Sequence, residues 1–502
     1  MLSSSGCRSC LGTDPSITRA ETLIDFRERN ITDILRCDGV YYPLVNAGDP
    51  DRKFCEWAVD FRWSDVDPAL QQHALRLVAD HLGCVLGGVD HSTAAACRRL
   101  SPWVEGGATI IGTPLRSTAS EAARQNSIAS HVIEMDDLVP TASLHPGSVV
   151  IPAALAAAEH SGADGKQTLA AIVAGYELII RLGEAVDPAR HYADGFHPTA
   201  TCGIFAAACA AALLRGADAP TLRRALGFAA TGASGTLSYL NDGAPTKPVQ
   251  VGNAAAYGVM AAILNDTGVP GPSTVFSGRH GFYQAYAPQA DPERLVDGLG
   301  CEPLRIGQTG FKPLACCGYI QPAAGLVLEL VRGGLRREQV DRIRVGVVST
   351  GMPIIGEPRA AKLHPASVTD AQFSLPFCVA VVLSRGRLTP VDLVADLRDP
   401  EVAKLAERVD LVPDVHLDAD YPQHWGGWVE LELHGGHRLR REAGDAKGYP
   451  GNPLSRAELE QKVATMAGQE RGEAIMEAAE ILPDGGVRAL LAHLEPTKVR
   501  SR

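Results

Sequence analysis

The feature that most constrains the fold of this chain is a stretch from about Thr118 to Thr267 that is dense in alanine and leucine and interrupted by glycine. Its segments run for one to several helical turns, and their small side chains let neighbouring helices approach closely. The longest apolar run, Cys202 to Leu214, covers 13 residues, whereas a membrane span needs about 20. We therefore expect a compact helical bundle in which this run is a buried helix, with no membrane association.

The pattern changes near Cys301. Residues 342–350 (RIRVGVVST) alternate apolar and polar side chains, as half-buried strands do, and residues 428–440 indicate two strands joined by a Gly435-Gly436 turn. Helix-like segments are expected at about 371–383, 400–409 and 456–479. Helical, then mixed, then helical segments predict a mainly α protein. We expect a large, discontinuous all-α domain with an inserted, smaller α+β lid domain.

Composition excludes several classes of protein. Of 502 residues, 45% are hydrophobic, enough to fill a sizeable core, so disorder across most of the chain is excluded. The net charge of −11 disfavours nucleic-acid binding, which normally needs a basic excess. The N-terminus lacks the apolar core of a secretory signal, and the 12 cysteines are scattered. We expect a cytoplasmic protein with reduced thiols, and a mitochondrial location stays open.

Two polar groups stand out in the helical region, because burying them costs free energy unless something compensates. Glu134, Asp136 and Asp137 are followed by His145, and three carboxylates this close repel one another unless a cation, proton or donor is near. Alternatively, they form a solvated helix end with Asp137 as a cap. His197 precedes the apolar run, where it is either a capping or core histidine or a base in a site.

Two further groups contain lysine. Lys247 lies between Pro245 and Pro248, so we expect a stiff loop that directs its ammonium group, although an ordinary surface lysine would fit as well. Lys312 precedes the vicinal pair Cys316 and Cys317. Taken alone, these cysteines indicate packing, because neighbouring cysteines are poor joint metal ligands.

In this order and spacing the groups resemble one family, MmgE/PrpD, which includes 2-methylcitrate dehydratase and cis-aconitate decarboxylase. The resemblance covers about residues 52–490. It is carried by E-M-D-D-L…S-L-H-P-G-S, G-F-H-P-T, T-K-P-V-Q-V-G-N-A-A, G-R-H-G-F (278–282) and K-P-L-A-C-C-G-Y. It implies an N-terminal extension at 1–51, a helical domain at 52–307 and 452–490, a lid at 308–451 with the site between the two, and a homodimer.

The family's substrates are small di- or tricarboxylic acids, and its reactions make or break a bond next to a carboxylate. That chemistry needs a base with a pKa near neutrality and fixed cations where negative charge develops. The resemblance implies that Lys247 and Lys312, together with Cys317, bind substrate carboxylates, and that His145 and His197 exchange protons. Glu134 or Asp137 would orient a histidine or protonate a leaving hydroxyl.

The resemblance thus implies a cofactor-independent lyase that dehydrates or decarboxylates a 2-methylcitrate-, alkylcitrate- or cis-aconitate-like acid. No metal is expected, because an iron–sulfur hydratase needs at least three converging cysteines. Glu134 replaces the dehydratases' usual aspartate, and Leu138 and Gln321 replace a common threonine and histidine. Two alternatives stay open: an epimerase or isomerase acting at a carbon α to a carboxylate, and a non-catalytic helical dimer scaffold.

Overall fold

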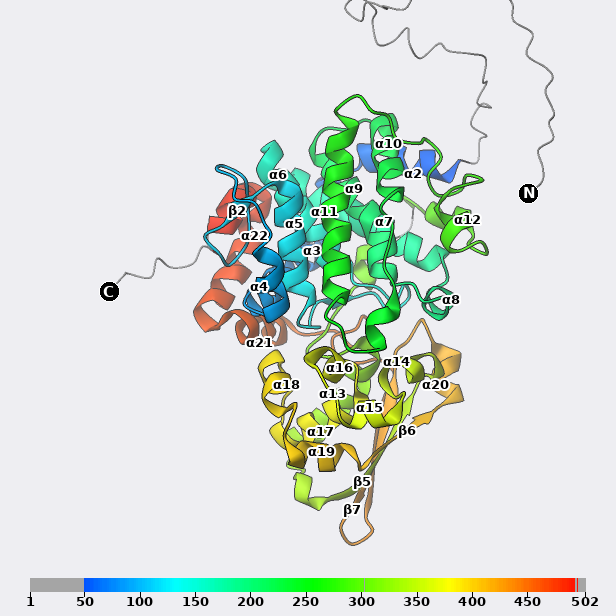
Figure 1. Cartoon of the computed structure of the whole chain (residues 1–502), viewed down its shortest axis with the longest axis vertical. Coiled ribbons are helices and arrows are strands. Elements are labelled where there is room, and N and C mark those ends of the chain that lie inside the picture. The colour runs from blue at the N-terminus through cyan, green and yellow to red at the C-terminus, as the bar shows by residue number, and fades with distance from the viewer. Residues whose placement is uncertain (1–48, 302, 493, 495–502) are drawn as a thin grey trace, which may run out of the picture. The chain divides into compact units, whose positions relative to one another are not determined.

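The computed structural model describes residues 49–301, 303–492 and 494 (Figure 1). Nearly all of the predicted N-terminal extension therefore lies outside the described residues, and α2 (Pro50–Asp60) begins directly after Asp49, whose side chain caps it. Most described residues lie in helices, and the sheets are few and small. The prediction of a mainly α protein is confirmed.

The first of two hydrophobic cores is built from helices. Its main helices are α3 (Pro68–Gly88), α5 (Ala119–His131), α6 (Gly147–Ser161), α7 (Gly165–Ala185), α9 (Pro198–Leu214), α10 (Ala219–Ala230) and α11 (Lys247–Asn265). Helix α9 contains the predicted apolar run and is buried along almost its whole length. It packs against α11, which also packs against α5 (Figure 1).

Glycine permits the closest of these helix contacts. A Cβ atom at Gly258 of α11 would lie 2.5 Å from the Ala207 Cβ and 2.7 Å from the Ile204 carbonyl oxygen, both on α9. Separations this short force atoms to move. The small residues that predicted close helix packing therefore occur where two helices of the first core meet.

The second core surrounds a four-stranded sheet in the order β6-β5-β7-β8. Its strands are β5 (Val340–Val347), β6 (Val409–Pro413), β7 (Gly427–Leu433) and β8 (Arg438–Ala443). The predicted hairpin is present, because β7 pairs antiparallel with β8 across Gly435 and Gly436, both at positive φ. Helices α13 (Gln321–Arg332) and α17 (Leu375–Arg385) contribute apolar side chains to the same core.

Two details of the sequence prediction were wrong. The expected single helix at 456–479 is two helices, α21 (Arg456–Ala467) and α22 (Gln469–Ala492), because the chain bends at Gly468 with φ 87°. The helix expected at 400–409 ends at Ala406 as α19 (Pro400–Ala406), and Val409 begins β6, which pairs parallel with β5. Local periodicity did not reveal this distant pairing.

Helices α21 and α22 return to the first core, where they pack against α3 and α7. Residues on both sides of the sheet-containing segment therefore share the first core, as a discontinuous helical body requires. The boundaries predicted at 307/308 and 451/452 stay predictions. No helix in the part of the chain that the structure describes combines the length and apolarity needed to cross a bilayer.

Candidate active site

The acidic loop between α5 and α6 is held by a short strand pairing. In it, β3 (Asp137–Leu138) pairs antiparallel with β4 (Gly310–Phe311). Because Asp137 lies opposite Phe311, the pairing brings the next residue, Lys312, beside the loop. Glu134 and Ser143 adopt left-handed backbone conformations, with φ 54° and 49°. Such conformations cost about 1–2 kcal/mol for residues other than glycine and concentrate at functional sites.

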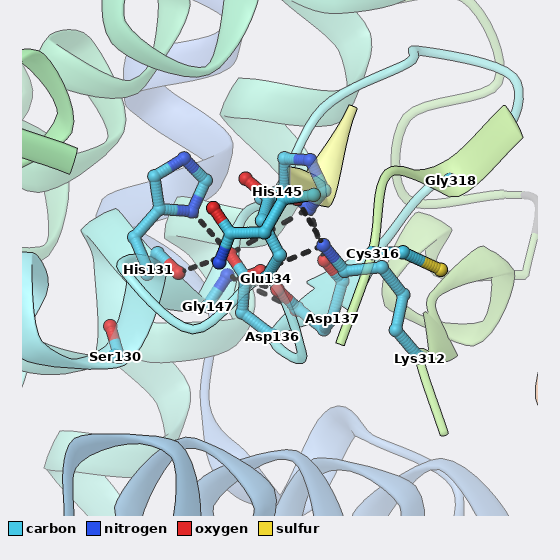
Figure 2. Close-up of polar contacts among 12 residues, drawn as sticks. Ser130, His131, Glu134, Asp136, Asp137, His145, Gly147, Lys312, Cys316 and Gly318 are labelled. Carbon is cyan, nitrogen blue, oxygen red and sulfur yellow. Dashed lines mark hydrogen bonds and ion pairs between the residues drawn. The ribbon is translucent and has the colours of Figure 1, made fainter. Parts of the chain in front are cut away.

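Two carboxylates of this loop form a buried ion network with two lysines from elsewhere in the chain. Figure 2 shows three members of the network, Glu134, Asp136 and Lys312. Glu134 binds the Lys247 ammonium through Oε1 and the Lys312 ammonium through Oε2, the latter at 3.0 Å. Lys312 Nζ also lies 3.0 Å from Asp136 Oδ1. All four side chains are buried, so each charge relies on its partners rather than on water.

The network holds its members in their charged forms. Burial alone would raise the pKa of Glu134, but Lys247 and Lys312 outweigh it and hold that pKa below its usual range. Burial would likewise raise the pKa of Asp136, and Lys312 and His131 lower it well below normal. For Lys312, burial lowers the pKa, but Asp136 and Glu134 raise it above its ordinary value.

Three histidine rings adjoin the network. His131 Nδ1 donates to Asp136 Oδ2 at 2.5 Å, and Ser148 Oγ donates to the same oxygen at 2.5 Å. His145 Nδ1 donates to the backbone carbonyl of Asp137 at 2.6 Å. The ring centres of His131 and His145 are 5.2 Å apart, and those of His131 and His197 are 6.0 Å apart. The three imidazoles thus form one cluster.

Burial favours the neutral form of all three histidines. Burial lowers the pKa of His145 to about 3. Burial and then Lys247 lower the pKa values of His131 and His197. His131 Nε2 and both ring nitrogens of His197 are buried without a hydrogen-bond partner. These atoms are available to take up or pass on a proton.

Several of these side chains lie at helix ends. His131 ends α5, His197 precedes α9, and Lys247 begins α11. The carboxylate of Asp137 accepts the backbone N–H of Gly147, which begins α6. Helix N-termini carry partial positive charge, so the starts of α6, α9 and α11 favour an anion here.

A small cavity of about 30 Å³ lies beside the network. Its lining combines polar and aromatic side chains from both cores: Glu134, Leu138, Ser143, His145, Tyr192, Tyr239, Leu240, Lys247, Cys317, Gly318, Tyr319, Ile354, Phe373 and Trp425. These lining side chains leave a narrow space in the described conformation.

The structure brings four of the predicted site residues to the cavity: Glu134, His145, Lys247 and Cys317. Lys312 and His197 are fully buried and do not line it. Burial and then Glu134 raise the pKa of Cys317 to about 12, so a neutral thiol faces the cavity.

The structure bears on three expectations about these residues. Asp137 does not line the cavity, because Tyr176 and Gly147 donate to its side chain, and burial and then Asp136 raise its pKa to about 8. It binds the start of α6, but it is buried, so the alternative of a solvated helix end is wrong; its role in proton transfer stays a prediction. Lys247 begins a helix rather than lying in a stiff loop. The two lysines are bound to protein carboxylates and are not free clamps.

Sequence reasoning missed several residues of the site. The structure pairs the side chain of Asp136 with His131, a histidine that sequence reasoning did not consider. Sequence reasoning had assigned the orientation of a histidine to Glu134 or Asp137. The aromatic lining, Tyr192, Tyr239, Tyr319, Phe373 and Trp425, was missed as well. Asp136 belongs to the same acidic stretch as Glu134 and Asp137, and this could have identified it as a site residue. No local pattern marks the aromatic residues, because their cavity faces come from separate segments.

Removing Lys312 tests the ion network. In Lys312→Met, Glu134 keeps one cation and Asp136 loses its lysine, so we expect the free energy of unfolding to fall by about 3–5 kcal/mol. Urea denaturation followed by circular dichroism measures this. Lys166→Met, which removes an exposed pair with Asp484, should change stability by less than about 1 kcal/mol. Equal losses in the two variants would contradict the assigned role of the network.

Two family models match this chain one after the other. The MmgE/PrpD N-terminal domain matches residues 52–295, and the MmgE/PrpD C-terminal domain matches residues 314–482. The cis-aconitate decarboxylase-like protein oryM of Aspergillus oryzae is 28% identical, over 84% of this chain and 91% of its own length. A cis-aconitate decarboxylase of Aspergillus terreus is 27% identical (86% and 91%), and that of Homo sapiens 26% identical (78% and 82%). With both domain families matched in order, the chain belongs to the MmgE/PrpD family.

Proposed function

We propose that this chain is a lyase that acts on a small di- or tricarboxylic acid without a cofactor, and that it decarboxylates a cis-aconitate-like acid. The observation that carries the proposal is the convergence of Lys247, Lys312 and three histidines beside one cavity. Decarboxylation is favoured over dehydration because the relatives above are named as cis-aconitate decarboxylases or as similar to one. The predicted homodimer and cytoplasmic location stay predictions.

Binding of an anion involves an exchange of partners at Lys247. This lysine lines the cavity, and its ammonium binds Glu134. A substrate carboxylate that reaches Lys247 competes with Glu134, which keeps its second partner, Lys312. The starts of α9 and α11 add positive potential on the same side. Lys247 is thus assigned to contact the substrate, and Lys312 to hold Glu134 and Asp136 in place.

His145 is assigned to proton transfer because it is the histidine of the cluster that lines the cavity. Its Nδ1–H donates to the Asp137 carbonyl, which leaves Nε2 to gain or lose a proton. When the substrate decarboxylates, the bond between carbon and carboxylate breaks and CO₂ leaves. The bonding electron pair stays on the carbon skeleton and takes up a proton from protonated His145, which solvent then reprotonates.

Mass spectrometry of the reaction products tests the proposed function. Purified protein is incubated with cis-aconitate, citrate, 2-methylcitrate and longer alkylcitrates. We expect a product that is lighter by CO₂ and that carries one non-exchangeable deuterium when the reaction runs in D₂O. Loss of water would show a dehydratase, and deuterium uptake without loss of mass would show an isomerase. Unchanged substrates throughout would contradict the proposal.

Kinetics of three variants test the residue roles. His145→Gln should lower kcat by about 10²–10⁴-fold with a smaller change in KM, because it removes the proton donor. His197→Asn should lower kcat less, because His197 does not line the cavity. Lys247→Met should mainly raise KM. The exposed His160 offers a control, His160→Gln, which should behave as wild type. Normal kcat in both His145→Gln and His197→Asn would remove the proton-transfer assignment.

Binding should also take up protons. Burial lowers the pKa of His145 to about 3, so its ring is neutral in the free protein at neutral pH. Bound carboxylates favour the charged ring and raise this pKa. Between the free and the bound pKa, binding takes up a proton, so affinity falls as pH rises through the bound pKa. Calorimetry of citrate binding at pH 6 in buffers of different ionisation enthalpy measures the uptake. A binding enthalpy that is the same in all buffers would contradict it.

A further inference from the structure

One of the four buried lysines among the described residues is bound differently from the other three. Lys247, Lys312 and Lys462 each form an ion pair with a buried carboxylate, for Lys462 that of Asp80 at 2.5 Å. Lys362, in α15 (Arg359–Leu363), is only 7% exposed. Its ammonium donates to two backbone carbonyl oxygens, those of Ile354 at 2.6 Å and Phe373 at 2.8 Å. Within the described chain it makes no ion pair.

The charge of Lys362 is therefore only partly balanced. Burial lowers its pKa, and Cys317 and Asp370 act in the opposite direction. Asp370 does not contact the ammonium, because its carboxylate accepts hydrogen bonds from the N–H and hydroxyl groups of Ser367. A buried charge without a counter-ion costs several kcal/mol. Neutral donors could hold two carbonyl groups without that cost, so the positive charge itself calls for an explanation.

The position of Lys362 beside the cavity wall offers an explanation for its charge. Both carbonyl groups that it binds belong to residues that line the cavity, Ile354 and Phe373. Lys247 Nζ lies 5.4 Å from the centre of the Phe373 ring. Phe373 thus has the substrate-contacting lysine at its ring and Lys362 at its carbonyl. The Lys362 charge thus lies behind residues of the cavity wall, where a low dielectric constant screens it less than water does.

We propose that Lys362 is a positioning residue for the substrate, and that it balances the charge of a second carboxylate while Lys247 binds the first. The proposal rests on the proposed function, because it requires an anionic substrate. Lys247 belongs to the first core's helix α11 and Lys362 to a helix beside the second core, so each core provides one cation. The preferred substrates are therefore acids with at least two carboxylates, the second directed at the wall of Ile354 and Phe373.

Binding of citrate and its carboxamides tests this proposal. Each carboxamide form replaces one carboxylate with a neutral group of nearly the same shape. For wild type we expect one such form to bind at least about 10-fold more weakly than citrate. In Lys362→Met, the affinity for citrate should fall by a similar factor, while the affinity for that carboxamide should stay as in wild type. The readout is the ratio of the two dissociation constants, measured by calorimetry.

Further variants separate charge from structure. Lys362→Gln keeps two N–H donors without the charge, so the ratio of the carboxamide and citrate dissociation constants should fall towards 1. Lys362→Arg keeps the charge and should keep the wild-type ratio. If Lys362→Met does not fold, Lys362→Gln decides the question. Lys404→Met removes an exposed lysine that pairs with Glu401 on α19 and so changes the net charge equally. It should bind every ligand as wild type does.

The outcomes distinguish this proposal from the proposed function. Equal weakening of citrate and all carboxamides in Lys362→Gln and Lys362→Met would show a purely structural role and overturn the proposal. Unchanged citrate binding in both variants would overturn it as well. In either case wild-type binding and turnover leave the proposed function standing. A wild-type protein that neither binds nor converts any of the carboxylic acids would overturn both.

Discussion

The site depends on the pairing of two buried carboxylates with two buried lysines. Glu134 and Asp136 come from one loop, Lys247 from the start of α11, and Lys312 from the residue after β4. Each charge alone would be costly away from water, so the arrangement is stable only when all four are present. This requirement brings together three segments that are far apart in sequence. It also compensates for the left-handed backbone at Glu134.

Helix ends and two hydrophobic cores complete the arrangement. The first core positions the end of α5 and the starts of α6, α9 and α11 around the ion network. The second core supplies most of the aromatic wall and, through α15, Lys362. The protein carries a net charge of −11, yet beside the cavity two lysines balance the two buried carboxylates, and helix N-termini add positive potential. The proposed function relies on this local potential rather than on the net charge.

Much of this organisation could be predicted from the sequence. Small and apolar residues predicted the helical core and the buried helix α9, and strict alternation predicted β5 and the β7–β8 hairpin. The motifs identified Glu134, His145, Lys247 and Lys312, which the structure places in or beside one site. What the sequence left open concerns partners. It offered both a chemical and a capping role for Asp137, and the structure shows its side chain bound to the start of α6. The histidine that contacts Asp136, His131, was overlooked.

The sequence by itself determined most of the helical segments, strand β5, the β7–β8 hairpin, and which polar residues are too costly to bury without partners. These properties follow from local periodicity and from the chemistry of single side chains. Only the tertiary structure decided which carboxylate each lysine binds, which segments line the cavity, and that Lys362 is buried without a carboxylate partner. Ion pairing and cavity shape depend on distances between segments 100 or more residues apart, such as Glu134 and Lys247. Local sequence patterns carry no information about such distances.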